Sequence, residues 1–393
     1  NSRNNQSTIG VISKANFKAS DALDFNFGVD WRTADIEHYR EVRDLLGGSY
    51  FLSTDNDFWG PNGKKLGLGD KVAYNFSNTV DWLGFFGQGE YSLGRLTAYG
   101  MAGYSTIKYT YTNHFMDAGD GTELELSNDP TSGYQAKGGA KFSVLEDLDV
   151  FGNVGLVSKV PIFDEVIDDR TGVFADNPEN EKFTSFEFGT NYFAGNFTAK
   201  LSYYYTKWAD RAISRGVTNP DGSDAIVFIS GMDQLHTGVE FELAYQPMNW
   251  VRLDVAGSVG NWSYLNDVSA QYKDYENLDN PTAELNLYTK DLKVGDAPQT
   301  QFAIAPSVYP MKGLFLQAVY RYYASHYADF NPLDRDDPTD RVQSWKAPNY
   351  GVLDFHGSYR LPISIGGIGL SVYGHVFNAL EEIFVQDLSL IHI

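Results

Sequence analysis

The sequence predicts an all-β protein whose strands form an antiparallel transmembrane β-barrel. Hydrophobic residues make up 42% of the chain, yet no run approaches the roughly 20 apolar residues that a transmembrane helix needs. Along many segments, apolar and polar side chains alternate with the period of two expected for a sheet whose faces meet different surroundings. Short and long connections between these segments also alternate regularly. These three observations favour membrane-spanning hairpins.

The composition supports strands and excludes several classes of protein. Aromatic residues reach 15% and glycine numbers 38, a mixture that suits strands and turns. The chain has no cysteine, which excludes disulfides, thiolate metal sites and a cysteine nucleophile. The net charge of −21 argues against a nucleic-acid partner, because binding to phosphates needs clustered Lys and Arg. No signal peptide is recognisable at the start, so we expect it to have been removed or the chain to be a fragment.

The alternation is clearest near the middle of the chain. Val251, Leu253 and Val255 point to one face of a predicted strand, while Arg252 and Asp254 point to the other. Applied to the whole sequence, the same pattern predicts about 14 strands. They lie near 7–17, 22–33, 78–91, 95–110, 133–145, 148–159, 182–194, 197–210, 234–246, 250–263, 299–310, 314–327, 350–361 and 367–378.

Every second connection is short. The predicted turns are Ser20-Asp21, Leu93-Gly94, Glu146-Asp147, Gly195-Asn196, Pro247-Met248-Asn249, Pro310 to Gly313 and Pro362 to Gly366. The others are long, near 34–77, 111–132, 160–181, 211–233, 264–298 and 328–349, and several are rich in Asp and Glu. Outer-membrane barrels combine short periplasmic turns with long extracellular loops, so we expect the long loops to be extracellular.

The second face of the strands carries too many charges for a packed core. An open sheet of this length would leave unpaired backbone groups at its edges in lipid, so the strands must close into a barrel. The charged face is then predicted to meet water or a polar plug. By parity it contains Asp24, Asp30, Arg32, Glu90, Arg95, Lys137, Lys141, Glu187, Lys200, Arg252, Asp254, Arg321, Asp354 and Arg360.

Four segments carry a resemblance to a known family. They are WLGFFGQGEY from Trp82, LTAYGMAGY from Leu96, YYYTKWADR from Tyr203 and HVFNALEE from His375. Together they resemble the β-barrel of TonB-dependent receptors. The last segment is similar to the Asn-Ala-Leu-like element that follows the penultimate strand in that family.

The resemblance implies a 22-stranded barrel whose lumen is filled by an N-terminal plug. Counted back from the end, residues 1–386 would be strands eight to twenty-one, with no plug, no TonB-contacting segment, no earlier strands and no last strand. Residues 387–393, DLSLIHI, are expected to be a non-native tail, or alternatively the natural start of a loop. The implied partners are the TonB–ExbB–ExbD complex, reached through the missing plug, and outer-membrane lipid.

The implied function is TonB-dependent uptake of an extracellular nutrient such as a carbohydrate or siderophore. The alternative is a passive outer-membrane channel without a plug. We expect no enzyme, because the seven histidines are scattered and no Gly-x-Ser-x-Gly motif occurs. No cofactor is expected either. The acidic loops, such as Asp334 to Asp340, lack the Ca²⁺-loop spacing and are predicted to be solvated.

Aromatic residues of the long loops and strand ends are the candidate ligand contacts, because their rings can stack on a sugar or an aromatic siderophore. The alternative for such residues is an interfacial girdle or packing within the loops. The candidates are Phe58, Trp59, Trp208, Trp262 and Trp345.

Overall fold

The structure is a computed structural model that describes the chain except residues 170–171, 176–177, 220–221, 275–282 and 386–393. The predicted tail at 387–393 therefore lies outside the described residues. The fold is almost entirely β, as predicted, and the residues that the structure describes include one short helix, α1 (Phe163–Val166), and one 3₁₀ turn, η1 (Pro332–Asp334). No helix in the described part of the chain has the length and apolar character needed to cross a bilayer.

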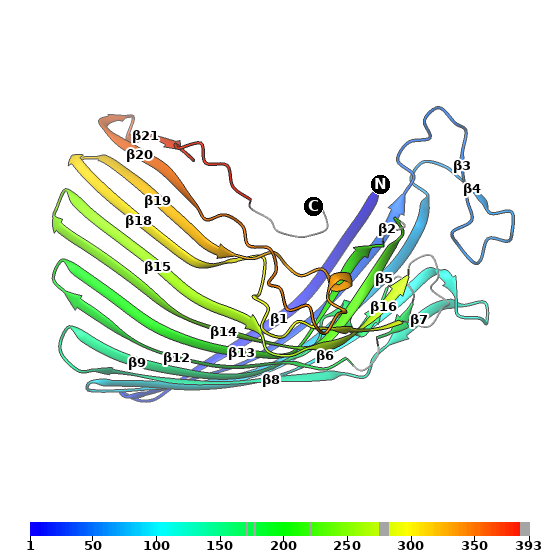
Figure 1. Cartoon of the computed structure of the whole chain (residues 1–393), viewed down its shortest axis with the longest axis horizontal. Helices are drawn as coiled ribbons and strands as arrows, with labels where there is room; N and C mark the ends of the chain where they lie inside the picture. Colours follow the sequence, from blue (N-terminus) through cyan, green and yellow to red (C-terminus); the bar gives the residue numbers. More distant parts are fainter. Residues whose placement is uncertain (170–171, 176–177, 220–221, 275–282, 386–393) are drawn as a thin grey trace. The chain divides into compact units, whose positions relative to one another are not determined.

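All the predicted long strands are present in one antiparallel sheet (Figure 1). They are β1 (Ser2–Ser20), β2 (Leu23–Glu41), β5 (Lys71–Leu93), β6 (Leu96–Asp117), β8 (Thr131–Ser143), β9 (Leu148–Lys159), β12 (Glu181–Ala194), β13 (Phe197–Thr218), β14 (Asp224–Met248), β15 (Val251–Tyr264), β18 (Pro298–Met311), β19 (Leu314–His326), β20 (Tyr350–Ile365) and β21 (Ile368–Val376). Several are longer than predicted, because hairpin pairing continues into the long connections, as between Ser214 and Phe228.

The long connections also contain short strands that the sequence pattern did not predict. Three of them join the main sheet: β7 (Glu123–Ser127), β16 (Val268–Asp274) and β17 (Ala283–Leu287). The others form two separate two-stranded sheets. These consist of β3 (Phe51–Ser53) with β4 (Lys64–Leu66), and β10 (Ile167–Asp168) with β11 (Val173–Phe174).

The chain divides into two compact units. The first comprises residues 1–90, 100–137 and 157–181, and the second comprises residues 91–99, 138–156 and 182–393. Within the second unit, successive long strands from β12 to β15 pair antiparallel, and so do those from β18 to β21. Strand β15 pairs with β18, which continues the ladder across the long connection. Within the first unit, β1 pairs with β2.

Several turns lie one or two residues later than predicted. Pro247 is still within β14, beside a register shift, and the turn consists of Asn249 and Trp250. The β20–β21 turn is Gly366-Gly367, where both residues have positive φ, of 59° and 84°. Two-residue hairpins need this backbone conformation, which glycine adopts without a steric penalty, so the glycine pair rather than Pro362 sets the turn.

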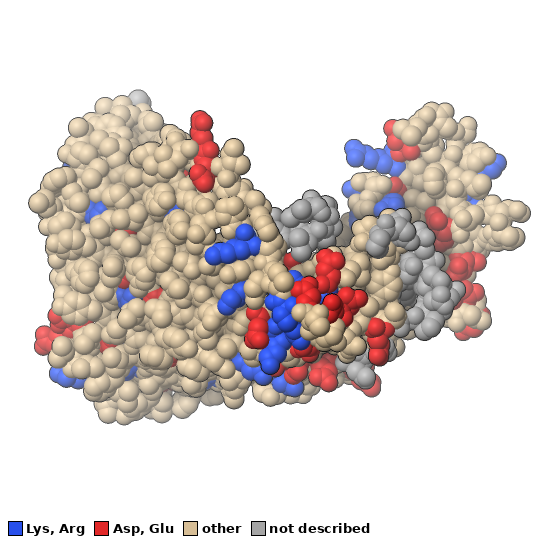
Figure 2. All heavy atoms as spheres, viewed as in Figure 1, with Lys and Arg blue, Asp and Glu red and all other residues tan. Residues whose placement is uncertain are grey.

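The two faces of the sheet differ as the alternation predicted. In the second unit, Val154, Phe188, Val259 and Val372 are 50% to 63% exposed, although each is apolar. Figure 2 shows a surface with few charged residues over the turn-end halves of β14, β15, β18 and β19, whereas Lys, Arg, Asp and Glu gather nearer the loop ends. An exposed apolar band flanked by charge is the surface expected of strands that face lipid.

The packed cores lie among the long connections. In the second unit, Val227, Ile229, Met232, Leu287 and Leu292 are each at most 1% exposed and form one cluster. In the first unit a second cluster forms around Tyr111 and Ile167, which are fully buried. The loop ends are therefore folded layers in which apolar side chains are removed from water.

Candidate functional site

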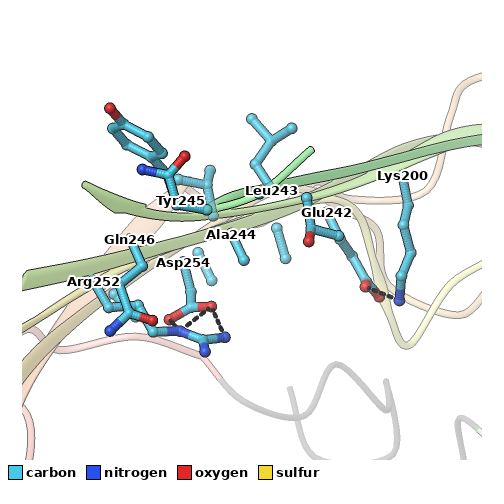
Figure 3. A pocket seen from close by; sticks show the side chains of 15 residues that line it. Lys200, Glu242, Leu243, Ala244, Tyr245, Gln246, Arg252 and Asp254 are labelled. Atoms are coloured by element: carbon cyan, nitrogen blue, oxygen red, sulfur yellow. Dashed lines mark hydrogen bonds and ion pairs between the residues drawn. The ribbon is translucent and has the colours of Figure 1, made fainter. Parts of the chain in front are cut away.

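The polar face of the second unit contains a continuous row of charged side chains. Arg252 and Asp254 from β15 and Lys200 from β13 point to the side opposite Leu243 and Tyr245 (Figure 3). They line a shallow pocket of about 530 Å³, which also includes Glu242 and the small residues Ala244, Ala256, Ala303 and Ala305. Arg252, Asp254 and Lys200 thus lie on one face of the sheet, as the alternation of apolar and polar residues predicts.

Charged side chains of this face pair with one another, both across neighbouring strands and along one strand. Lys200 lies directly opposite Glu242 across β13 and β14, and the ammonium nitrogen is 2.8 Å from Glu242 Oε2. Arg252 donates through Nη2 to Asp254 Oδ1 at 2.6 Å, and both residues lie on the same strand. Glu187 on β12 accepts a hydrogen bond of 3.2 Å from Asn153 on β9. Lys200 and Arg252 are therefore each neutralised by a neighbouring carboxylate.

Arg321 and Asp354 form the most buried ion pair of this face. Arg321 on β19 donates through Nη2 to Asp354 Oδ2 on β20, and the Asp354 side chain is only 1% exposed. The other carboxylate oxygen accepts the backbone N–H of Asn378 at 2.7 Å. The amide of Asn378 in turn bonds to Glu382, so the Asn-Ala-Leu element is fixed against β20. The sequence singled out each of these residues but not their contact.

Aromatic residues gather on the same face closer to the long connections. Trp262 on β15 donates through Nε1 to the hydroxyl of Tyr204 at 2.9 Å, and its ring lies 5.4 Å from that of His236. Trp208 on β13 packs on Phe183 at 4.9 Å and is covered by the guanidinium of Arg211 at 4.3 Å.

The structure thus places two of the predicted ligand-contact residues, Trp208 and Trp262, on one face of β13 and β15. Sequence analysis did not single out their neighbours Tyr204 and His236. The alternation of side chains would have identified them, because each lies an even number of positions from the charged residue of its own strand that lines the pocket. Aromatic rings grouped in this way can pack against a planar solute.

The remaining predicted residues lie elsewhere. Trp345 is 49% exposed in the connection between β19 and β20. Arg95 is in the turn between β5 and β6, where it donates to the carbonyl of Val144 at 3.1 Å. Glu90 is near the end of β5 in the first unit, and its side chain is exposed.

Phe58 and Trp59 belong to the first unit, in the connection between β2 and β5. Trp59 packs against a core of Val42, Leu66 and Val72, and its ring lies 5.4 Å from that of Phe115. Phe58 is 41% exposed beside it. Packing within the loop therefore accounts for Trp59, while Phe58 offers its ring to solvent.

Two connections of the second unit are joined by a bidentate ion pair. Arg341 donates through Nη1 and Nη2 to the two carboxylate oxygens of Asp267, at 2.7 and 2.9 Å. Hydrogen bonding to Arg341 holds the pKa of Asp267 below its ordinary value. The guanidinium also lies 5.2 Å from the ring centre of Tyr288.

In the first unit, burial raises the pKa of Glu165 on α1.

Known proteins share the β-barrel architecture of this chain. Residues 1–379 match the family model described as TonB dependent receptor-like, beta-barrel. The chain belongs to this family. No curated protein is significantly similar to the chain.

Solved structures resemble the chain at low sequence identity. The copper transporter OprC matches with a TM-score of 0.68 and 14% identity, over 99% of this chain and 53% of OprC. The siderophore receptor PiuA from Acinetobacter baumannii matches with a TM-score of 0.65 and 13% identity, over 99% of this chain and 54% of PiuA. The ferric yersiniabactin uptake receptor FyuA from Yersinia pestis gives 0.60 and 15%, over 98% and 50%. The chain thus has their barrel fold and spans about half their length.

Membership of the TonB-dependent receptor barrels agrees with the chemistry of the faces. The described residues contain no group of three or more His, Asp or Glu placed to hold a metal ion. In the second unit, one face of the sheet is apolar and exposed, and the other carries paired charges and an aromatic cluster.

Proposed function

We propose that the protein takes up an extracellular nutrient across the outer membrane in a TonB-dependent manner. The ligand binds at the long connections, and the TonB–ExbB–ExbD complex rearranges a plug domain to release it inward. The observation that carries the proposal is the contrast between the apolar exposed face and the ion-paired polar face. Lys200, Arg252 and Arg321 give the latter the polarity of a surface that meets water or a polar plug.

The aromatic cluster suggests the ligand class. Trp208, Trp262 and Tyr204 present rings and a hydroxyl on the polar face, and exposed Phe58 and Trp345 lie in long connections. Such residues suit a planar ligand, either a metal chelate with aromatic groups or a carbohydrate ring. Since the charges of the polar face are largely paired with one another, stacking and hydrogen bonding rather than net charge would select the ligand.

Energy dependence tests the proposal. Cells that produce the full-length protein would be given radiolabelled ferric citrate, ferric yersiniabactin or a maltodextrin, with and without a functional TonB. We expect accumulation of at least one probe, lost without TonB and lost when the proton-motive force is collapsed. Equal accumulation of small solutes in both strains, with steady conductance of the purified protein in planar bilayers, would instead identify a passive channel.

A further inference from the structure

Two histidines lie side by side on the polar face, away from the aromatic cluster. His356 on β20 is directly opposite His375 on β21 in the antiparallel ladder. Their Nδ1 atoms are 2.8 Å apart, and the ring centres are 5.0 Å apart with an interplanar angle of 62°. Because both backbones belong to paired strands, the ladder itself holds the two imidazoles together.

The spacing of the two nitrogens fits metal coordination. Two imidazole nitrogens bound at right angles to one metal ion, at the usual bond length, are about 2.9 Å apart. Right-angle coordination is the geometry of tetragonal Cu²⁺ and of octahedral Ni²⁺. When one of the two rings carries its proton on Nδ1, that N–H donates to the Nδ1 of the other ring. Moving that proton to Nε2 of the same ring frees both Nδ1 lone pairs without changing the charge.

We propose that His356 and His375 form a binding site for a divalent first-row transition metal ion, with Cu²⁺ bound most tightly. Imidazole nitrogen suits such ions, and a site of this kind follows the order in which Cu²⁺ exceeds Ni²⁺ and Zn²⁺. The site is independent of the proposed transport function, since it requires only that the two strands pair as they do.

The surroundings determine how many ligands the protein supplies. Asp354 is on the same side of β20, but both its carboxylate oxygens are already bonded, to Arg321 and to the Asn378 N–H. No third protein ligand is found among the described residues. The other coordination positions are therefore open to water or to a small chelator that carries the metal. Tyr373 and Phe377 flank His375 on the same strand side, with ring centres at 6.0 and 5.8 Å.

Titration of the purified protein in detergent with CuCl₂ tests the site. Electron paramagnetic resonance of the bound ion should show one equivalent of Cu²⁺ with two equatorial nitrogen ligands. His356→Gln and His375→Gln should each weaken binding by about tenfold or more, since one of two protein ligands is lost, and the double variant should abolish it. Competition should show weaker binding of Ni²⁺ and Zn²⁺.

His38→Gln is the matched control, because this histidine stacks on Phe76 at 4.9 Å in the other unit and does not touch the pair. It should bind Cu²⁺ as the unaltered protein does. Resistance of each variant to unfolding by detergent at room temperature shows that the barrel is intact. The proposal is overturned if the unaltered protein takes up no Cu²⁺ with nitrogen ligands, or if the folded double variant binds it equally well.

Discussion

The contact between Arg321 and Asp354 shows what single residues contribute to the polar face. Alternation predicts that both side chains point away from lipid, but only the register of β19 and β20 reveals that they touch. Asp354 is nearly fully buried, and a buried charge is tolerated only when it is paired and hydrogen-bonded. The backbone N–H of Asn378 supplies the second partner, and asparagine suits this position because its φ is 48° and its side-chain amide bonds to the backbone of Glu382.

Arg321→Ala tests this network. The substitution leaves Asp354 buried without its cation, so the free energy of unfolding should fall by about 2 to 3 kcal/mol. This loss is smaller than that for a fully buried ion pair, because the Arg321 side chain is partly exposed. Urea unfolding in detergent micelles measures the change. Lys200→Ala, whose pair with Glu242 is exposed on both sides, should cost less than about 1 kcal/mol. Equal losses in both variants would contradict a special role for the Asp354 pair.

The link between Asp267 and Arg341 predicts a pH dependence. The pKa of Asp267 lies below its ordinary value of about 3.8 because Arg341 bonds to the carboxylate. The contact is therefore fully present above that ordinary value and is lost as the pH falls through the lowered pKa. Hydrogen exchange of the Lys290 N–H, which donates to Asp267 Oδ1, should lose its protection only in that acid range.

Asp267→Asn gives the matched comparison for this contact. The amide cannot form the ion pair, so the Lys290 N–H should exchange faster even at pH 7. A variant that is protected as well as the unaltered protein at pH 7 would show that Arg341 does not hold the two connections together.

At the scale of the elements, the long strands and their order were predictable because each presents two different faces over many residues. The errors lie where that periodicity is absent. Strands β3, β4, β10 and β11 are too short for a period of two to be recognised, and they lie inside connections whose composition resembles ordinary loops. The turn at Pro247 was misplaced because a proline usually ends a strand, whereas here it sits in an irregular stretch beside the turn.

Neighbouring positions on β13 test which face meets lipid. Leu201 is 50% exposed on the apolar face, while Ser202 points to the polar face opposite Glu240. Leu201→Lys should destabilise the folded protein by about 2 to 4 kcal/mol in a bilayer, because a charge in the middle of the membrane is poorly solvated. Ser202→Lys should be nearly neutral. Folding yield and urea midpoints in lipid vesicles measure both, and the opposite ranking would reverse the assignment of the faces.

For the whole chain, the fold was predictable and the grouping of the candidate site was predictable only in part. Parity placed Lys200, Arg252 and Asp254 correctly on one face. The same alternation assigns Trp208, Trp262, Tyr204 and His236 to that face, but only the register of several strands shows that Trp262 contacts Tyr204 and His236. Nor could the alternation show that Trp59, unlike the other predicted ligand contacts, packs in a core within the first unit, because the residues that form this core are separated in the sequence.

The β3–β4 hairpin is a separate sheet, and this affects how the sequences of related barrels can diverge. Its two strands hydrogen-bond in register only with each other, Phe51 with Leu66 and Ser53 with Lys64. Exchange of this hairpin for another would therefore not remove a strand from the main sheet, although Leu66 and Trp59 pack against Val42 and Val72 and would need apolar replacements. Recombination among related genes would then replace the hairpin as a cassette, so that this part of the chain diverges faster than the strands of the main sheet.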